Sequence, residues 1–350
     1  MRVYLTRFMT TEILPTDLPQ EFKSAVDAAV RLLAAGEVVA LPTETVYGLA
    51  ADALNAEAVA KIFEAKERPT FDPLIVHLPH KKDLDTVAEV PETIAPVVKK
   101  LVERFWPGPL TIVLPKKACV PDLVTAGQPT VAVRASKDLV FTRVIRTFGK
   151  PLAAPSANRF GSISPTSANA VKAELDGVIP LILDGGACHF GLESTIIKIE
   201  PAAPKPLITI LRPGPITPDD LKVFGRVQLV NKKSRNAPEV PGQLESHYAP
   251  RTPLRILDRP SDFIPEAGKK YALLSYRGEI ADGYLDRHEW SAVHVLSPGK
   301  GKAPEAAVRF FFALRQLDNS GVDEIIAEPI PERGIGIAIM DRLRRAAVVK

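Results

Sequence analysis

Along the first two thirds of the chain, segments with apolar residues at helical spacing alternate with short, continuous apolar runs. Apolar residues at helical spacing predict helices at residues 24–35, 55–68 and 91–105, with Asn55 as an N-cap and Pro69 ending the second helix. Short continuous apolar runs predict buried strands at 38–41, 74–78, 110–114, 131–133, 151–154, 181–183 and 195–199. This alternation predicts an α/β fold with a twisted, mixed sheet between helices.

A second, smaller set of elements follows a proline-rich stretch. Residues 201–253 hold ten of the 33 prolines, a density typical of a connector. Beyond it, the pattern predicts strands at 254–257, 271–275, 292–296 and 324–327, and helices at 304–317 and 336–346. We therefore expect a larger α/β domain at 12–222, a linker at 223–252, and a smaller Rossmann-like α/β domain at 253–350.

The composition excludes several classes of protein but does not indicate a specific function. A length of 350 residues suits two domains, and 46% apolar with 25% charged residues is typical of a packed globular protein. The net charge of +4 does not indicate a nucleic-acid binder. The two cysteines do not have the spacing of a redox or zinc site, and no stretch resembles a signal peptide or a membrane span. We expect a cytoplasmic protein with no membrane partner.

Several common catalytic signatures are missing from the sequence. It has no phosphate-binding loop of the G-x-x-x-x-G-K-S/T type, no complete dinucleotide fingerprint and no G-x-S-x-G nucleophile elbow. The six histidines form no metal-binding pair on a helix, so we assign no metal ligands. These absences argue against metal-dependent and serine hydrolases.

Small polar and cationic residues recur directly after the predicted strands. Because ligands of α/β folds bind beyond strand ends, this recurrence favours one shared polar pocket, although each residue alone could be an ordinary turn or cap residue. The residues are Thr43, Thr45, Arg134, Ser156, Asn158, Ser194 and Thr195.

Three cations stand out at predicted element ends. Lys66 and Arg68 end a helix, where they either complement the helix dipole or, if the end is unwound, hold a polyphosphate. Arg134 leaves a buried strand and needs an anionic partner, which could be a substrate carboxylate or an internal Asp or Glu.

Taken together, the motifs resemble one family, the YrdC-type threonylcarbamoyl-AMP synthases in their long, two-domain form. In the first half they are LPTETVYGL at 41–49, KERP at 66–69, PLIVH at 73–77, FWPGPLT at 105–111 and VAVR at 131–134. Downstream they are APSAN at 154–158, SPT at 164–166, EST at 193–195, LRPG at 211–214, SHYAP at 246–250 and MDRL at 340–343. The resemblance covers nearly the whole chain.

The resemblance implies a nucleotidyltransferase. Such an enzyme converts ATP, L-threonine and bicarbonate to threonylcarbamoyl-AMP and pyrophosphate, with Mg²⁺ accompanying ATP. The product would be handed to a tRNA threonylcarbamoyl transferase that modifies the adenosine beside the anticodon. Catalysis would consist mainly of positioning two anions and neutralising charge, with no covalent enzyme intermediate.

Site residues follow from the resemblance, position by position. Thr45, His77, Arg134 and Ser194 would bind L-threonine, with Arg134 on its carboxylate. Lys66 and Arg68 would be catalytic, on the phosphates. The ATP side would consist of Lys66, Arg68, Asp72, Thr130, Ser156, Asn158, Ser164, Arg212 and Tyr248. Tyr248, with His247, belongs to the family's linker, which would fold over the pocket and exclude water.

The sequence departs from the family pattern at two places near the expected site. Asp72 stands where many members carry Asn, so it needs a metal, a sugar hydroxyl or a cation beside it, and residues 135–138 differ from the family's usual turn.

Lys232, Lys233 and Arg235, or the arginines at 342, 344 and 345, could instead hold RNA weakly. Carbamoyl-adenylate proteins reuse this domain but carry signature modules that this sequence lacks.

Overall fold

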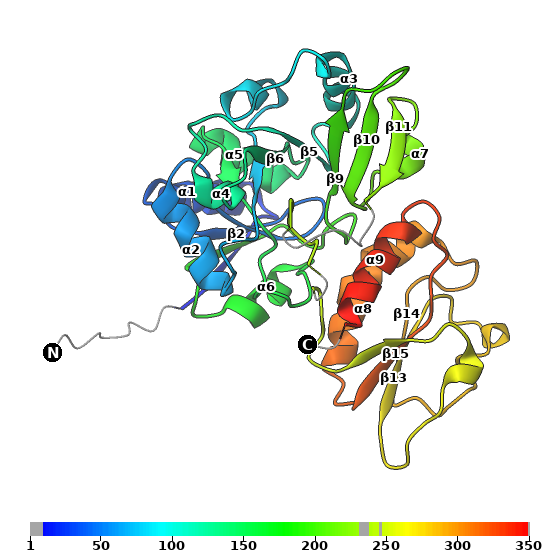
Figure 1. Ribbon diagram of the computed structural model, residues 1–350. Coiled ribbons are helices and arrows are strands. Elements are labelled where there is room, and N and C mark those ends of the chain that lie inside the picture. Colours follow the sequence, from blue (N-terminus) through cyan, green and yellow to red (C-terminus); the bar gives the residue numbers. More distant parts are fainter. Residues whose placement is uncertain (1–9, 231–237, 245–246, 349–350) are drawn as a thin grey trace.

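The computed structural model describes residues 10–230, 238–244 and 247–348. Figure 1 shows two parts: a larger one, blue to green, and a smaller one, yellow to red, with α8 and α9 on the side that faces the larger part. No helix among these described residues is long and apolar enough to cross a bilayer.

The larger part is built on one mixed sheet. Within the described residues it has 11 strands in the order β1-β8-β2-β3-β7-β4-β6-β5-β9-β10-β11, with both parallel and antiparallel neighbours. The strands are β1 (Glu12–Pro15), β2 (Val39–Leu41), β3 (Gly48–Asp52), β4 (Ile75–His77), β5 (Leu110–Pro115), β6 (Thr130–Arg134), β7 (Leu152–Ala153), β8 (Leu181–Asp184), β9 (Thr195–Glu200), β10 (Leu207–Arg212) and β11 (Arg226–Leu229).

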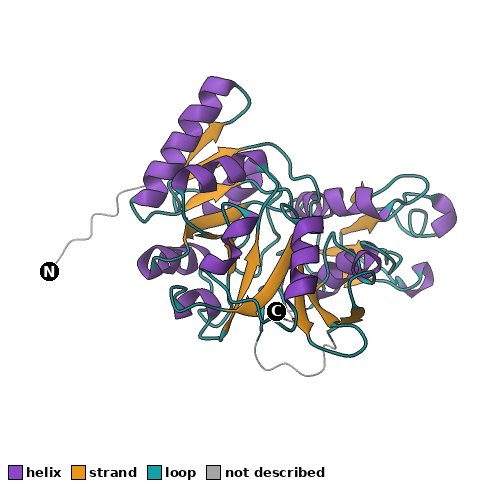
Figure 2. Cartoon of the chain, turned by 90° about the horizontal axis from the view of Figure 1, so that it is seen from above, coloured by secondary structure: helices purple, strands orange, loops and turns teal. Residues whose placement is uncertain are grey.

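Helices pack around this sheet, as Figure 2 shows in purple against the orange strands. They are α1 (Pro19–Ala34), α2 (Ala56–Lys66), α3 (Ala95–Phe105), α4 (Asp122–Thr125), α5 (Leu139–Phe148), α6 (Ala168–Leu175) and α7 (Pro218–Leu221), with a 3₁₀ turn at Lys81–Thr86. Asn55 caps α2 as expected, because its side chain accepts hydrogen bonds from the backbone N–H groups of Glu57 and Ala58.

The smaller part is a four-stranded, all-parallel sheet in the order β12-β15-β13-β14. It consists of β12 (Leu254–Ile256), β13 (Tyr271–Ser275), β14 (Ala292–Val295) and β15 (Glu324–Ala327), with helices α8 (Ala303–Asp318) and α9 (Gly336–Ala346). Phe310 and Leu314 of α8 and Leu343 of α9 are buried in the core of this part. The predicted class, a mixed-sheet α/β domain followed by a smaller parallel α/β domain, is confirmed.

The expectation that residues 201–253 form a connector is wrong for 207–229. That stretch contains β10, α7 and β11, which extend the large sheet, and β11 lies beyond residue 222, where we expected the first domain to end. The prolines lie around these elements: Pro206 precedes β10, Pro213 follows it, and Pro218 begins α7. Proline is tolerated at such positions, so its density alone did not exclude strands.

Strand β3 was also not indicated by the pattern. Its sequence, Gly-Leu-Ala-Ala-Asp, has no β-branched residue, yet all five positions are buried between β2 and β7. Burial between two strands, and not local preference, makes this segment extended.

Candidate active site

The pocket lies where several strands of the large sheet end. In the parallel pair β4–β6, His77 is in register with Arg134, so the last residues of two neighbouring strands lie side by side. In the antiparallel pair β9–β10, Arg212 is in register with Ile196, which brings it next to Ser194. The sheet therefore places a histidine, a serine and two arginines around one space.

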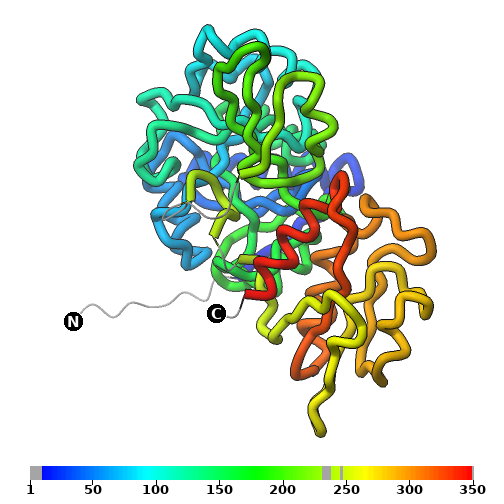
Figure 3. The backbone as a smooth tube through the Cα atoms, turned by 45° about the vertical axis from the view of Figure 1, so that its right-hand side comes forward, coloured from blue at the N-terminus to red at the C-terminus, as the bar shows by residue number. Residues whose placement is uncertain are grey.

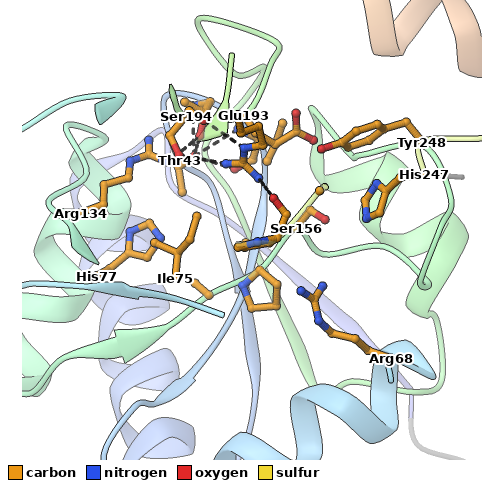
Figure 4. A pocket seen from close by; sticks show the side chains of 18 residues that line it. Thr43, Arg68, Ile75, His77, Arg134, Ser156, Glu193, Ser194, His247 and Tyr248 are labelled. Atoms are coloured by element: carbon orange, nitrogen blue, oxygen red, sulfur yellow. Dashed lines mark hydrogen bonds between the residues drawn. The ribbon is translucent and has the colours of Figure 1, made fainter. Parts of the chain in front are cut away.

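Figure 4 shows how these side chains surround the pocket. Arg134 and His77 lie on one side, Ser194 and Glu193 at the top, and Arg68, His247 and Tyr248 on the opposite side. The lining residues are Thr43, Thr45, Val46, Gly48, Arg68, Ile75, His77, Arg134, Ala154, Pro155, Ser156, Glu193, Ser194, Arg212, Pro241, Gly242, His247 and Tyr248.

The four residues expected to bind threonine all line the pocket. Arg134 donates hydrogen bonds to the Thr45 hydroxyl (3.0 Å) and to the backbone oxygen of Gly108 (3.2 Å). The Ser194 hydroxyl is hydrogen-bonded to the hydroxyl of Thr111, 2.8 Å away. His77 packs against the ring of Phe141.

Arg134 has an internal partner, which the sequence left undecided. Its Nη2 lies 2.7 Å from Oε1 of Glu44, and Ser136 donates a hydrogen bond to the other oxygen of that carboxylate. Burial opposes ionisation of Glu44, but Arg134 and Ser136 outweigh burial and lower the pKa of the carboxyl. The pair fixes the orientation of the Arg134 guanidinium at the wall of the pocket.

The residues expected on the ATP side divide into two groups. Arg68, Ser156, Arg212 and Tyr248 line the pocket, whereas Lys66, Asp72, Thr130, Asn158 and Ser164 are not among its described lining residues. Thr130 begins β6 and Arg134 ends it, so the two lie about 13 Å apart along the strand. Asn158 donates to the backbone oxygens of Arg159 and Ser162.

Lys66 lies behind the pocket wall. Its ammonium group donates to the backbone oxygens of Ser156 (2.6 Å) and Asn158 (2.5 Å). Burial, with Arg68 nearby, lowers the pKa of Lys66 well below its usual value. Lys66 and Arg68 diverge because Glu67 between them adopts a left-handed conformation (φ +52°) that ends α2.

Asp72 pairs with a cation, Arg68, as expected for a carboxylate at this position. Its carboxylate lies 2.9 Å from Nη2 of Arg68, and the same guanidinium donates to the backbone oxygens of Asp72 and Pro73. Both side chains of this pair are buried. The ion pair explains how a carboxylate is accommodated here.

The linker closes the pocket. His247 and Tyr248 are buried within it, and Arg212 donates to the backbone oxygen of Pro241 as well as to the backbone oxygen and hydroxyl of Ser194. The remaining free space is about 40 Å³, enough for a few water molecules but too little for ATP. The linker residues Pro241, Gly242, His247 and Tyr248 thus form part of the pocket wall.

Two carboxylates of the site were not predicted from the sequence. Glu44 and Glu193 both stand inside motifs that carried the resemblance, but neither had been given a role. A buried arginine needs a nearby anion, so Arg134 was the available signal for Glu44.

The three described arginines proposed for an RNA surface are paired with carboxylates. Arg342 pairs with Glu193, Arg344 with Glu332, and Arg345 with Asp341. Lys232, Lys233 and Arg235 lie outside the described residues. No group of three His, Cys, Asp or Glu side chains within the described residues is arranged to hold a metal ion.

Comparison with known families agrees with this geometry. Residues 31–214 match the family model Sua5/YciO/YrdC, described as telomere recombination, and residues 216–348 match the model described as threonylcarbamoyl-AMP synthase, C-terminal domain. The chain belongs to the threonylcarbamoyl-AMP synthase family.

Relatives in this family match along their whole length. The threonylcarbamoyl-AMP synthase of Pyrococcus abyssi is 39% identical over 355 residues, covering 97% of this chain and 98% of the relative. The synthase of Bacillus subtilis is 41% identical over 350 residues, covering 96% and 95%. A solved structure of Pyrococcus abyssi Sua5 complexed with L-threonine superposes with a TM-score of 0.83 at 36% identity, covering 96% of this chain and 98% of that one.

Proposed function

We propose that this chain is a threonylcarbamoyl-AMP synthase that converts ATP, L-threonine and bicarbonate to threonylcarbamoyl-AMP and pyrophosphate. The observation that carries this proposal is the pocket itself, in a chain that matches the family over both domains. Arg134 and Arg212 reach this pocket from strand ends, and Arg68 reaches it from the end of α2. Three buried guanidiniums suit two anionic substrates, an amino acid and a nucleotide.

In this proposal the two substrates occupy opposite sides of the pocket. Threonine lies against Thr45, His77, Arg134 and Ser194, where the guanidinium of Arg134 binds its carboxylate and the hydroxyls orient the rest. Burial, with Arg134 nearby, lowers the pKa of His77 well below its usual value, so its imidazole is neutral there at pH 7. A neutral ring adds no further charge beside Arg134.

The nucleotide would lie on the side of Arg68, Ser156, Arg212 and Tyr248, and would enter with Mg²⁺ on its phosphates as a substrate complex. Bicarbonate carboxylates the threonine amine with loss of water, an oxygen of the resulting carbamate attacks the α-phosphorus, and pyrophosphate leaves. Arg68 and Arg212 neutralise the phosphates, while Lys66 holds the segment at 156–158 that faces the nucleotide. Asp72, Thr130, Asn158 and Ser164 would act from behind the lining residues.

The product is an activated intermediate, so we propose that it passes to a tRNA threonylcarbamoyl transferase. Such a role places the chain where tRNA is modified, in the cytoplasm. The linker that covers the pocket would protect the acyl adenylate from water until release.

Pyrophosphate release tests the proposal. The chain is incubated with ATP, Mg²⁺, bicarbonate and single amino acids, and we expect release that depends on both threonine and bicarbonate. Release driven by carbamoyl phosphate, or no release together with tight, salt-sensitive RNA binding, would overturn it.

A further inference from the structure

The last helix of the chain buries an arginine against the catalytic domain. Arg342 of α9 is 0% exposed, and its Nε lies 3.0 Å from Oε2 of Glu193, which lines the pocket. Its Nη1 lies 3.0 Å from the carboxylate of its neighbour Asp341. A guanidinium is costly to bury, so this position is built around the carboxylate of another domain.

Glu193 is held from two sides. Its second oxygen, Oε1, accepts a hydrogen bond of 2.5 Å from the hydroxyl of Ser164. The next residue, Ser194, accepts two hydrogen bonds from Arg212. Arg342 therefore acts on a carboxylate that adjoins both the expected threonine side and the expected phosphate side.

Arg342 also supports the linker. Its guanidinium carbon lies 5.4 Å from the centre of the Tyr248 ring, and the neighbouring Arg345 donates to the backbone oxygen of Leu244. Tyr248 has a positive φ of 64° and packs on Phe311 of α8. Leu244 and Tyr248 of the linker are thus both contacted by side chains of the C-terminal domain. Figure 3 shows the yellow-green chain of this region beside the red C-terminal helix.

We propose that Arg342 is a positioning residue, through which the C-terminal domain holds Glu193 and Tyr248 in the closed pocket and so sets the affinity for the nucleotide. The proposal rests on the function proposed above. Arg342 touches no substrate in this account: it acts through the carboxylate beside Ser194 and through the ring that covers the pocket. The C-terminal domain would then be part of the active site and not only an appendage.

A second ion pair across the same domain boundary provides a matched control. Arg315 of α8 lies 2.9 Å from Glu174 of α6, with both side chains largely buried. Glu174 does not line the pocket. Glu174→Gln therefore breaks an interdomain pair of similar geometry, and Arg315 keeps its hydrogen bond to the backbone oxygen of Ile163.

The experiment compares Arg342→Gln, Arg342→Lys and Glu174→Gln in the full chain, with pyrophosphate release measured against ATP and against threonine. We expect Arg342→Gln to raise the KM for ATP at least 10-fold and the KM for threonine less than 3-fold. Arg342→Lys, which keeps a charge near Glu193 but loses the planar fork, should fall between Arg342→Gln and the wild type. Glu174→Gln should stay within 3-fold of the wild type for both substrates.

Three results would overturn the inference: unchanged kinetics in Arg342→Gln, equal losses for ATP and threonine, or an equal effect of Glu174→Gln. If Arg342→Gln does not fold, Arg342→Lys decides by the same criteria. A wild-type chain that releases no pyrophosphate would instead contradict the proposed function. As a further test, Arg342→Gln should raise the KM for ATP by a smaller factor in a Tyr248→Leu background than in the wild type, because Arg342 acts partly through that ring.

Discussion

Arg134 and Glu44 form a buried ion pair of 2.7 Å at the wall of the pocket. The pair explains how a strand can end in a guanidinium inside the protein before any substrate arrives. A threonine carboxylate bound as proposed would share Arg134 with Glu44, and the planar fork of arginine allows this because its several N–H donors can bind two carboxylates at once.

Replacing Arg134 should affect threonine more than ATP. We expect Arg134→Gln to raise the KM for threonine about 10- to 100-fold, since a hydrogen bond to a charged group contributes about 1.5–3 kcal/mol. The KM for ATP should change less than 3-fold. Steady-state pyrophosphate release measures both.

Stability separates this effect from unfolding. Arg134→Gln leaves Glu44 buried and unpaired, which costs about 3–5 kcal/mol of unfolding free energy. The double variant Arg134→Gln/Glu44→Gln should recover much of that stability in urea denaturation but not the use of threonine. Recovery of threonine use in the double variant would show that Arg134 serves only to pair Glu44.

Lys66 should act through the segment it anchors. Lys66→Met removes both hydrogen bonds to the backbone oxygens of Ser156 and Asn158, and we expect kcat to fall at least 10-fold with a lower melting temperature. Lys61→Met on the same helix removes only the partly exposed pair with Glu37 and should leave kcat unchanged. Equal full activity in both variants would remove Lys66 from the site.

Asp72 should weaken nucleotide binding in the native chain. Asp72→Asn keeps an oxygen near Arg68 but removes a negative charge close to the expected phosphates, so the KM for ATP should stay equal or fall, by up to about 10-fold. Asp52→Asn is the control. Asp52 is also buried, its carboxylate lies 2.9 Å from the ammonium group of Lys150, and neither residue lines the pocket. A rise in the KM for ATP above 3-fold in a folded Asp72→Asn protein would contradict this interpretation.

Gly242 should be required for the closed linker. It has a φ of +79°, and a Cβ there would lie 2.4 Å from the Tyr248 hydroxyl and 3.2 Å from Cδ of Arg212. Gly242→Ala should therefore raise the KM for ATP at least 10-fold. Gly268 has nearly the same φ (+81°) with nothing within 4 Å of such a Cβ, so Gly268→Ala carries the backbone cost of about 1–2 kcal/mol without the clash.

These two variants can be compared directly. If Gly268→Ala reduces activity as much as Gly242→Ala at equal loss of melting temperature, backbone strain and not the displacement of Tyr248 accounts for the effect.

Stability should decline in mild acid because of two buried histidines. Burial and nearby cations lower the pKa of His77 and of His247 well below the usual value, so the unfolded chain takes up protons first as the pH falls. Their contribution is complete above a pH of about 6.5 and is lost as the pH falls toward the folded-state pKa, with a slope of up to about 1.4 kcal/mol per pH unit for each residue.

Urea denaturation at several pH values between 5 and 7.5 measures that slope. His77→Gln should reduce the slope of unfolding free energy against pH by the contribution of one histidine. The double variant His77→Gln/His247→Gln should reduce it by the contribution of two. Slopes that match the wild type in both variants would show that these histidines do not titrate differently on folding.

The sequence by itself determined the fold class, most elements and part of the pocket lining. Continuous apolar runs marked β4, β5 and β6 because buried strands need apolar residues on both faces, and the N-cap residue Asn55 marked the start of α2. The family motifs indicated Thr45, His77, Arg134, Ser194 and Arg212, and the structure brings all of them to one space.

Only the tertiary structure decided who pairs with whom. The partners of Arg134 and Arg342 are Glu44 and Glu193, which lie 90 and 149 positions away, and local sequence carries no record of such contacts. Likewise β3 and β10 are extended because neighbouring strands satisfy their backbone groups, although alanine and flanking prolines argued otherwise. Hydrophobic periodicity in the sequence indicates which face of a helix or strand is buried. Which charged residues pair across domains depends on how those elements pack against one another in the tertiary structure.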